Sequence, residues 1–166
     1  MINLFDECYL AGMSNMRFIS DNTYHIEQSK LYQDLGESVK TVEFVRVIGD
    51  KLLLIEAKAT FPNPANGEES FGTQINDICD KFLHSLHLYS SVKVGVNDEA
   101  FEEGFAPPEK ISLVFILVIK SHELKWCKPI QRKLALNLPI ALKNIWKPEI
   151  YVINHDEAIK RNYAVA

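Results

Sequence analysis

The chain has 166 residues, of which 47% are hydrophobic and 24% are charged, with 18 basic and 22 acidic side chains. This length and composition fit one globular domain and exclude disordered, collagen-like and disulfide-scaffold proteins. The formal net charge of −4 is unevenly distributed, because residues 1–109 sum to −10, residues 110–147 to +7 and residues 148–166 to −1. We therefore interpret residues 1–166 as a single, electrically polarised domain.

The cysteines and the apolar runs indicate where such a protein works. Cys8, Cys79 and Cys127 lie far apart and lack the C-x-x-C spacing of redox and zinc sites. Unpaired cysteines are typical of a reducing compartment, so we expect a cytoplasmic protein. The longest apolar run, Leu113 to Ile119, is too short to span a bilayer, and the first residues lack a signal-peptide pattern. We expect no membrane partner.

The N-terminal part of the chain carries the weakest secondary-structure pattern. Residues 4–13 predict a short helix. Residues 22–29 alternate as a strand does, although residues 27–35 are also compatible with a helix.

A β-hairpin is the clearest local prediction. Two aliphatic and β-branched runs, at residues 41–48 and 51–61, flank the dipeptide Gly49-Asp50. Glycine at the first position of a two-residue loop is typical of a type II′ turn. The pattern therefore predicts two antiparallel strands that pair Ile48 with Lys51.

Helices and strands alternate in the rest of the chain. Residues 61–70 are rich in Pro, Asn and Gly and predict a loop. Apolar residues at helical spacing predict a helix over residues 71–89, with Asp77, Lys81 and Ser85 on its solvent side. The later elements are a strand at 92–96, an acidic connection at 97–110, a buried strand at 111–120, a helix that starts at Pro129 and breaks before Pro139, a strand at 149–154 and a short helix from Asp156. This order predicts an α/β sandwich with a mixed sheet.

Two glutamates and a lysine meet on the predicted hairpin. The turn at Gly49-Asp50 places Glu43 opposite Glu56, and Lys58 shares the face of Glu56 because side chains alternate with period two. Directly opposed side chains lie about 4.5–5.5 Å apart, where like charges destabilise a sheet. A cation such as Mg²⁺, which one or two carboxylates bind, removes that repulsion. Lys58 would then orient or deprotonate an attacking water and offset charge on a phosphate.

These residues resemble the core of the PD-(D/E)xK nuclease superfamily. The match is Glu43 on the first hairpin strand, an apolar strand that ends in Glu56-Ala57-Lys58, and the helix that follows; Glu43 stands where Asp is commoner, and the Pro-Asp dipeptide is absent. The resemblance implies a restriction-endonuclease-like three-layer sandwich in which a mixed central β-sheet is flanked by helices. It also implies Mg²⁺- or Mn²⁺-dependent hydrolysis of phosphodiester bonds in DNA, or less often RNA, with Gln74 on that helix assisting.

The predicted catalytic residues are Glu43, Glu56, Lys58 and Gln74, and the predicted metal ligands are Glu43, Glu56 and Glu27. Glu27 is a candidate because its stretch is predicted as a strand, and its alternative is a plain surface position. For Gln74 the alternative is a helix cap. For the hairpin residues it is a solvated sheet face on which Lys58 balances the glutamates.

Basic side chains gather in the second half of the chain. The predicted nucleic-acid contacts are Lys125, Lys128, Arg132 and Lys133. Lys and Arg supply most of the non-specific affinity for nucleic-acid phosphates, and Trp126 or Trp146 nearby could stack on a base. The alternative is a charged helix face that balances the acidic part of the chain, for instance across a dimer interface.

Three functions stay open at this point. The favoured one is a metal-dependent nuclease of 166 residues, which would need a second subunit or a partner protein to grip a long substrate. The second is a catalytically inactive protein of the same fold that acts as a nucleic-acid-binding or protein-interaction module. The third is a small structural α/β protein in which the Glu-x-Lys pattern is accidental.

Overall fold

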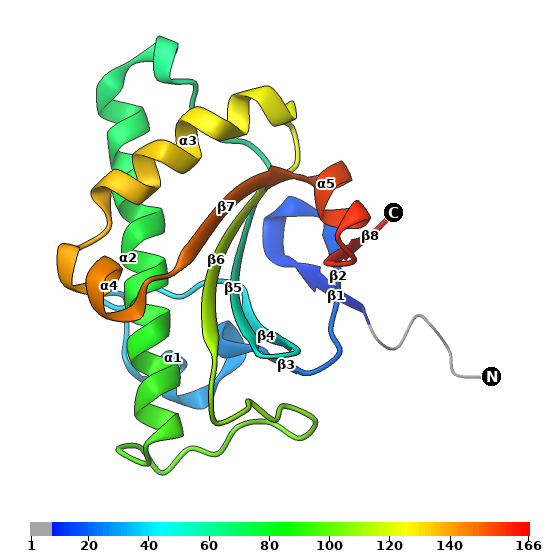
Figure 1. Ribbon diagram of the computed structural model, residues 1–166, viewed down its shortest axis with the longest axis vertical. Helices are drawn as coiled ribbons and strands as arrows, with labels where there is room; N and C mark the ends of the chain where they lie inside the picture. Colours follow the sequence, from blue (N-terminus) through cyan, green and yellow to red (C-terminus); the bar gives the residue numbers. More distant parts are fainter. Residues whose placement is uncertain (1–7) are drawn as a thin grey trace.

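The computed structural model describes residues 8–166, which form two β-sheets with helices around them (Figure 1). A five-stranded main sheet has the order β3-β4-β5-β6-β7, and a three-stranded small sheet has the order β1-β2-β8. The main-sheet strands are β3 (Thr23–Tyr24), β4 (Phe44–Ile48), β5 (Lys51–Lys58), β6 (Ser112–Ile119) and β7 (Glu149–Asn154). The small-sheet strands are β1 (Cys8–Ala11), β2 (Met16–Ile19) and β8 (Ala164–Val165).

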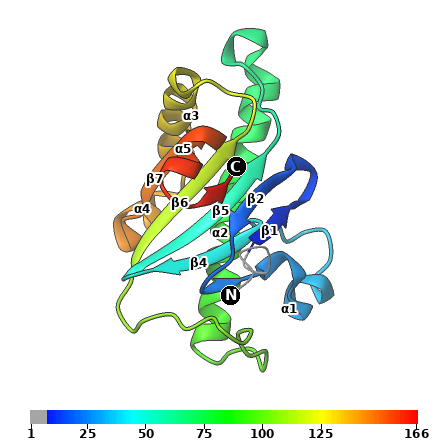
Figure 2. The same ribbon diagram turned by 90° about the vertical axis from the view of Figure 1, so that its right-hand side faces the viewer.

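The helices cover mainly one face of the main sheet. The helices on this face are α2 (Glu68–Lys93), α3 (Leu124–Asn137) and α4 (Ile140–Trp146), whereas α5 (His155–Lys160) lies with the small sheet on the opposite side (Figures 1 and 2). The connections contain α1 (Lys30–Asp34) and the 3₁₀ turns η1 (Gly12–Ser14), η2 (Ile26–Gln28) and η3 (Pro64–Asn66). The predicted α/β class with a mixed sheet is confirmed, but the second outer layer is the small sheet with α5 rather than a layer of helices. None of the helices within residues 8–166 combines the length and the hydropathy needed to cross a bilayer.

The predicted β-hairpin is confirmed, with its register, from Phe44 onward, but the strands predicted at 41–48 and 51–61 are shorter, at 44–48 and 51–58. In the antiparallel pair of β4 and β5, Ile48 lies opposite Lys51 and Phe44 opposite Ile55. Gly49 has a φ of +62°, which fits a turn that needs a positive φ at its first central residue. One further step in this register brings Glu43, the residue before β4, level with Glu56.

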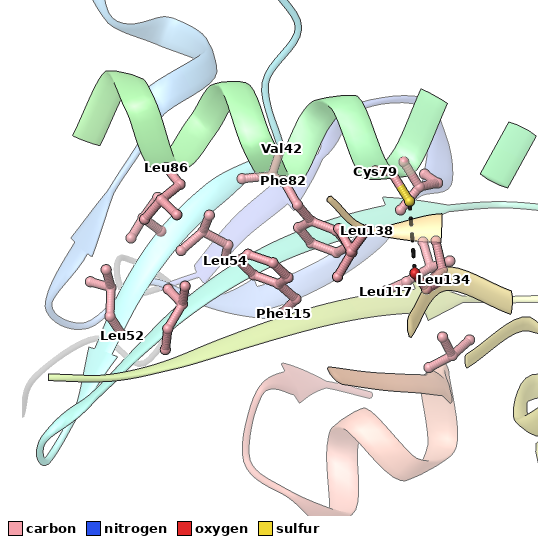
Figure 3. Close-up of a cluster of buried hydrophobic side chains, with 14 of the residues drawn as sticks. Val42, Leu52, Leu54, Cys79, Phe82, Leu86, Phe115, Leu117, Leu134 and Leu138 are labelled. Carbon is pink, nitrogen blue, oxygen red and sulfur yellow. Dashed lines mark hydrogen bonds between the residues drawn. The ribbon is translucent and has the colours of Figure 1, made fainter. Parts of the chain in front are cut away.

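Strands β5 and β6 lie at the centre of the main sheet and are buried on both faces. They are parallel to each other, and β7 continues the parallel arrangement. Leu52 and Leu54 face the helices, where the rings of Phe82 in α2 and Phe115 in β6 are stacked with centroids 4.5 Å apart (Figure 3). Leu53 and the other alternate residues of β5 and β6 form a second core toward the small sheet and α5. Burial on both faces explains why these strands are almost continuously apolar.

The N-terminal predictions differ most from the structure. Residues 8–13, part of the predicted helix at 4–13, form β1 and the start of η1, and residues 4–7 lie outside the described part of the chain. Strand β2 pairs with β1 on one edge and with β8 from the other end of the sequence on the other edge. The strand predicted at 22–29 is shortened to Thr23–Tyr24, since η2 follows it.

Two later boundaries also differ. The residues predicted as a strand at 92–96 form the end of α2 and a turn, because the helix continues to Lys93. Pro129 does not start a helix: α3 begins at Leu124 and contains the proline in its second turn. The predicted break before Pro139 is confirmed, as α3 ends at Asn137 and α4 begins at Ile140. The predicted strands at 111–120 and 149–154 are present as β6 and β7.

Truncation of the stacked core aromatic should destabilise the whole fold. We expect Phe82→Ala to lower the free energy of unfolding by about 3–5 kcal/mol, because Phe82 is 1% exposed and leaves a cavity against Phe115. Urea denaturation measures the loss. The control is Leu136→Ala on α3, where the side chain is 73% exposed and the expected change is within about 0.5 kcal/mol. Equal losses in the two variants would contradict this description of the core.

Candidate active site

Glu56 is a buried acid near the end of β5. Its side chain is 1% exposed, and the Nζ atom of Lys81 in α2 lies 2.7 Å from Glu56 Oε1. Lys58 Nζ lies 3.5 Å from the same oxygen, so both predicted members of the Glu-x-Lys pattern are in contact. A buried carboxylate is costly unless it is paired and hydrogen-bonded, and the two ammonium groups provide that compensation.

Burial and charge act in opposite directions on this pair. Burial raises the pKa of Glu56, and the positive charges of Lys81 and Lys58 reduce that shift without reversing it. Burial also acts to lower the pKa of Lys81, but the carboxylate of Glu56, together with Asp77 and Glu43, outweighs it and raises that pKa. Lys81 therefore carries a positive charge at neutral pH.

Glu43 and Glu27 complete a cluster of acids around Glu56. Burial raises the pKa of Glu43 to about 8, and the nearby carboxyl groups of Glu56 and Glu27 add to the shift. Glu27 is an exposed residue of η2, and its carboxyl group is near enough to Glu43 to contribute to the raised pKa of Glu43. The structure thus brings together the three acids that the sequence singled out.

Helix α2 fixes the segment that leads Glu43 to the sheet. The backbone N–H of Val42 donates to Ser85 Oγ at 2.8 Å, and the N–H of Lys40 donates to His84 Nδ1 at 3.1 Å. Both acceptors come from one turn of α2. Glu43 is therefore held in place by the same helix that supplies Lys81.

The turn η1 approaches Glu43 closely. Gly12 has a φ of +35°, and a Cβ atom at this position would lie 3.2 Å from Glu43 Oε1. That distance is shorter than ordinary van der Waals contact. A residue without a side chain therefore lets the backbone of η1 pass directly beside the carboxyl group.

The assignment of Asp77, Lys81 and Ser85 to the solvent side of the helix is wrong. The side chains of Asp77 and Lys81 are 28% and 20% exposed, and Ser85 is fully buried. Lys81 is the site residue that sequence reasoning missed. The signal that could have found it is the polar stripe at i, i+4 and i+8, on the helix that follows a strand ending in Glu-x-Lys.

The remaining predicted residues lie outside this cluster. Gln74 is half-buried on α2, about two turns before Lys81, and within residues 8–166 it makes no hydrogen bond to the glutamates. The basic residues are exposed on α3: Lys125, Lys128, Arg132 and Lys133.

Two carboxylate oxygens of the cluster suit a metal ion. Glu43 Oε2 and Glu56 Oε2 are buried and accept no hydrogen bond from the described residues. Such oxygens cost free energy when nothing binds them, and Mg²⁺ is usually held by one or two carboxylates together with water and phosphate oxygens. The donor set therefore fits a divalent cation bound by Glu43 and Glu56. Residues 8–166 contain no group of three or more His, Cys, Asp or Glu side chains arranged around one metal position.

Comparisons of the chain with protein-family models, with curated proteins and with solved structures gave no match. The chemistry of the acidic cluster and its lysines therefore carries the functional argument.

Removal of Lys81 should destabilise the protein through Glu56. We expect Lys81→Met to lower the free energy of unfolding at pH 7 by about 2–4 kcal/mol, because the closest cation to a buried carboxylate is lost. Adding Glu56→Gln in the double variant should recover part of the loss. Urea denaturation gives both values.

The control for this cycle is Lys125→Met. Lys125 and Glu123 form a pair at 2.9 Å, but their side chains are 64% and 70% exposed. Loss of an exposed pair should change stability by less than about 1 kcal/mol. A similar loss for Lys81→Met would show that the buried pair contributes no more than a surface pair.

The raised pKa of Glu43 predicts a pH-dependent cost of folding. Between the ordinary glutamate pKa of 4.5 and a value of about 8, the folded state keeps a proton that the unfolded state releases, so wild-type stability falls as pH rises. Glu43→Gln is neutral throughout, so its stability relative to wild type should increase through this range and reach about 2 kcal/mol near pH 8, because solvent screens much of the cost for a partly exposed carboxyl group. The gain follows from denaturation curves at several pH values. An equal pH profile for Glu109→Gln, which replaces an exposed acid, would contradict the assignment.

Proposed function

We propose that this protein is a metal-dependent nuclease that hydrolyses phosphodiester bonds. The observation that carries the proposal is the cluster of Glu43, Glu56 and Lys58, in which two buried carboxylate oxygens accept no hydrogen bond from the described residues. Mg²⁺ or Mn²⁺ would satisfy those oxygens, and the remaining coordination positions would take water and phosphate oxygens. The proposed partner is nucleic acid, DNA by the resemblance described above.

The order of elements in the main sheet supports a restriction-endonuclease-like core. Strands β3, β4 and β5 form an antiparallel run, α2 follows, and β6 returns parallel to β5. This is the order of the PD-(D/E)xK core after its first helix. That first helix has no counterpart in residues 8–19, which form the first two strands of the small sheet and η1.

The position of each residue in the cluster suggests its role. Glu43 and Glu56 would hold the metal, and Glu27 is close enough to Glu43 to join them. A bound divalent ion would supply Lewis-acid activation of water and of the phosphate. Lys58, half-buried beside Glu56, would offset negative charge on the phosphate in the transition state. Lys81 touches Glu56 and acts as a positioning residue.

A second candidate is an inactive protein of the same fold that binds nucleic acid. Lys81 favours it, because its ammonium group at 2.7 Å from Glu56 compensates the buried charge without a metal. Both candidates place nucleic acid on the exposed basic residues of α3. They differ in metal binding and in cleavage.

Metal binding should depend on the buried acid. We expect isothermal titration with Mn²⁺ to give saturable heat for the wild type and for Glu109→Gln, and none for Glu56→Gln, since the last variant loses one carboxylate ligand. Circular dichroism of each variant checks that it is folded. Absence of heat with the wild-type protein would rule out the metal site and favour the inactive candidate.

Cleavage should separate the role of Lys58 from metal binding. We expect Lys58→Ala to keep Mn²⁺ binding but to cut DNA or RNA at least about a hundredfold more slowly, because it removes a charge at the reacting phosphate. Gel assays with radiolabelled duplex, single-stranded and RNA substrates measure the rates. The same rate for Lys58→Ala and wild type would contradict the assigned role.

A further inference from the structure

A cavity of about 520 Å³ lies between the connections that follow β5 and β6. One wall is the connection from β5 to α2, with Asn63 and Pro64, and another is the connection from β6 to α3, with Ser121 and His122. Trp126, in the first turn of α3, also lines it. The cavity therefore combines an aromatic ring with hydrogen-bonding side chains.

Backbone hydrogen bonds connect one wall of this cavity to the end of β5. The N–H of Lys120 donates to the carbonyl oxygen of Lys58 at 2.9 Å, and the N–H of Ser121 donates to that of Ala59 at 3.1 Å. Ser121 is thus both a cavity residue and a neighbour of the strand end that carries Lys58. The cavity therefore adjoins the end of β5, while the side chains of the acidic cluster do not line it.

Trp126 is exposed in a way that suits a flat ligand. Its side chain is 48% exposed although it is large and aromatic, and Lys125 Nζ lies 5.5 Å from the ring centroid. Ser121 Oγ and His122 Nδ1 lie 3.5 Å apart beside it. Partial burial lowers the pKa of His122, so its ring is neutral at neutral pH and offers both a donor and an acceptor. Nucleobases present a π-face for stacking and polar edges for hydrogen bonds.

Cations lie along α3 beyond the cavity, and none of the three basic residues Lys128, Arg132 and Lys133 lines it. Lys128, Arg132 and Lys133 are exposed on α3 in the turns that follow Trp126. The acid that lines the cavity, Glu123, is paired with Lys125 at 2.9 Å. The helix therefore presents an aromatic ring at its start and cations along its length.

We propose that this cavity binds an unpaired base of a single-stranded nucleic acid, which stacks on Trp126 while Lys128, Arg132 and Lys133 contact the phosphates. The inference deepens the proposed nuclease function and rests on it for the class of substrate. A stacked base inside a duplex cannot present its face to Trp126, so the strand must be single or locally unpaired.

The second tryptophan makes a direct test possible. The chain contains 2 tryptophans, and Trp146 lies at the end of α4 in a separate apolar pocket with Leu86 and Ile145. In the variant Trp146→Phe, the fluorescence therefore comes from Trp126 alone. The probes are oligothymidylate, oligouridylate and an abasic oligodeoxynucleotide of equal length, each about twelve nucleotides long, with EDTA present to prevent cleavage.

Probes that carry bases should quench the fluorescence of Trp126 saturably, whereas the abasic probe should not. In anisotropy measurements, Trp126→Ala should bind the base-carrying probes about tenfold more weakly and the abasic probe unchanged. The paired change Lys128→Glu/Arg132→Glu should weaken binding of all three probes. A preference between oligothymidylate and oligouridylate would tell DNA from RNA, and either result supports the proposal.

Equal quenching by the abasic probe, or unchanged affinity of Trp126→Ala for every probe, would overturn the base-binding proposal. These measurements need no metal, so they are independent of the nuclease function. Glu56→Gln should bind the probes as tightly as wild type even when it cannot cut them. A wild-type protein that shows base-dependent quenching but cuts none of the substrates in the presence of Mn²⁺ would count against the nuclease function alone.

Discussion

The side chain of Glu56 in β5 is ionisable but only 1% exposed to solvent, and Lys81 Nζ of helix α2 lies 2.7 Å from Glu56 Oε1. Removing a charge from water costs several kcal/mol, which is repaid only when the partner stands at close range. The distance between β5 and α2 is therefore constrained. Phe82, the residue after Lys81, stacks on Phe115 of the neighbouring strand and holds the helix at that distance.

The same helix gathers acids from three separate stretches of chain. Glu27 comes from η2, Glu43 from the residue before β4 and Glu56 from β5. The hairpin brings two of them level, but the contacts of α2 with the backbone before Glu43 decide where the cluster forms. The position of the acidic cluster thus depends on how α2 packs on the sheet as much as on the hairpin itself.

Local sequence patterns were sufficient to predict the hairpin. They were insufficient for features that depend on contacts between segments far apart in the sequence. The register of β4 and β5 followed from one turn and a period of two, and its continuation by one residue places Glu43 opposite Glu56. The sequence pattern assigns Lys81 to the solvent side of its helix because the apolar stripe identifies only one buried side. In the structure α2 packs on a second side as well, and Lys81 lies there. The small sheet was missed because β2 pairs with β8, whose residues stand at the opposite end of the sequence. Pro129 lies inside α3, after five helical residues. Its missing N–H removes one backbone hydrogen bond, and the helix continues despite this loss.

Gly12 links the outer layer of the fold to the acidic cluster, because its backbone lies where any side chain would meet Glu43 Oε1 at 3.2 Å. The residue allowed at position 12 is thus constrained by the side chain of Glu43 as well as by the turn. Chains that keep Glu43 should keep glycine here. In chains that replace the acid with a smaller residue, the steric constraint disappears and the position is limited only by its positive φ, which asparagine and aspartate tolerate. Covariation between these two positions would therefore record whether a lineage has retained the acid.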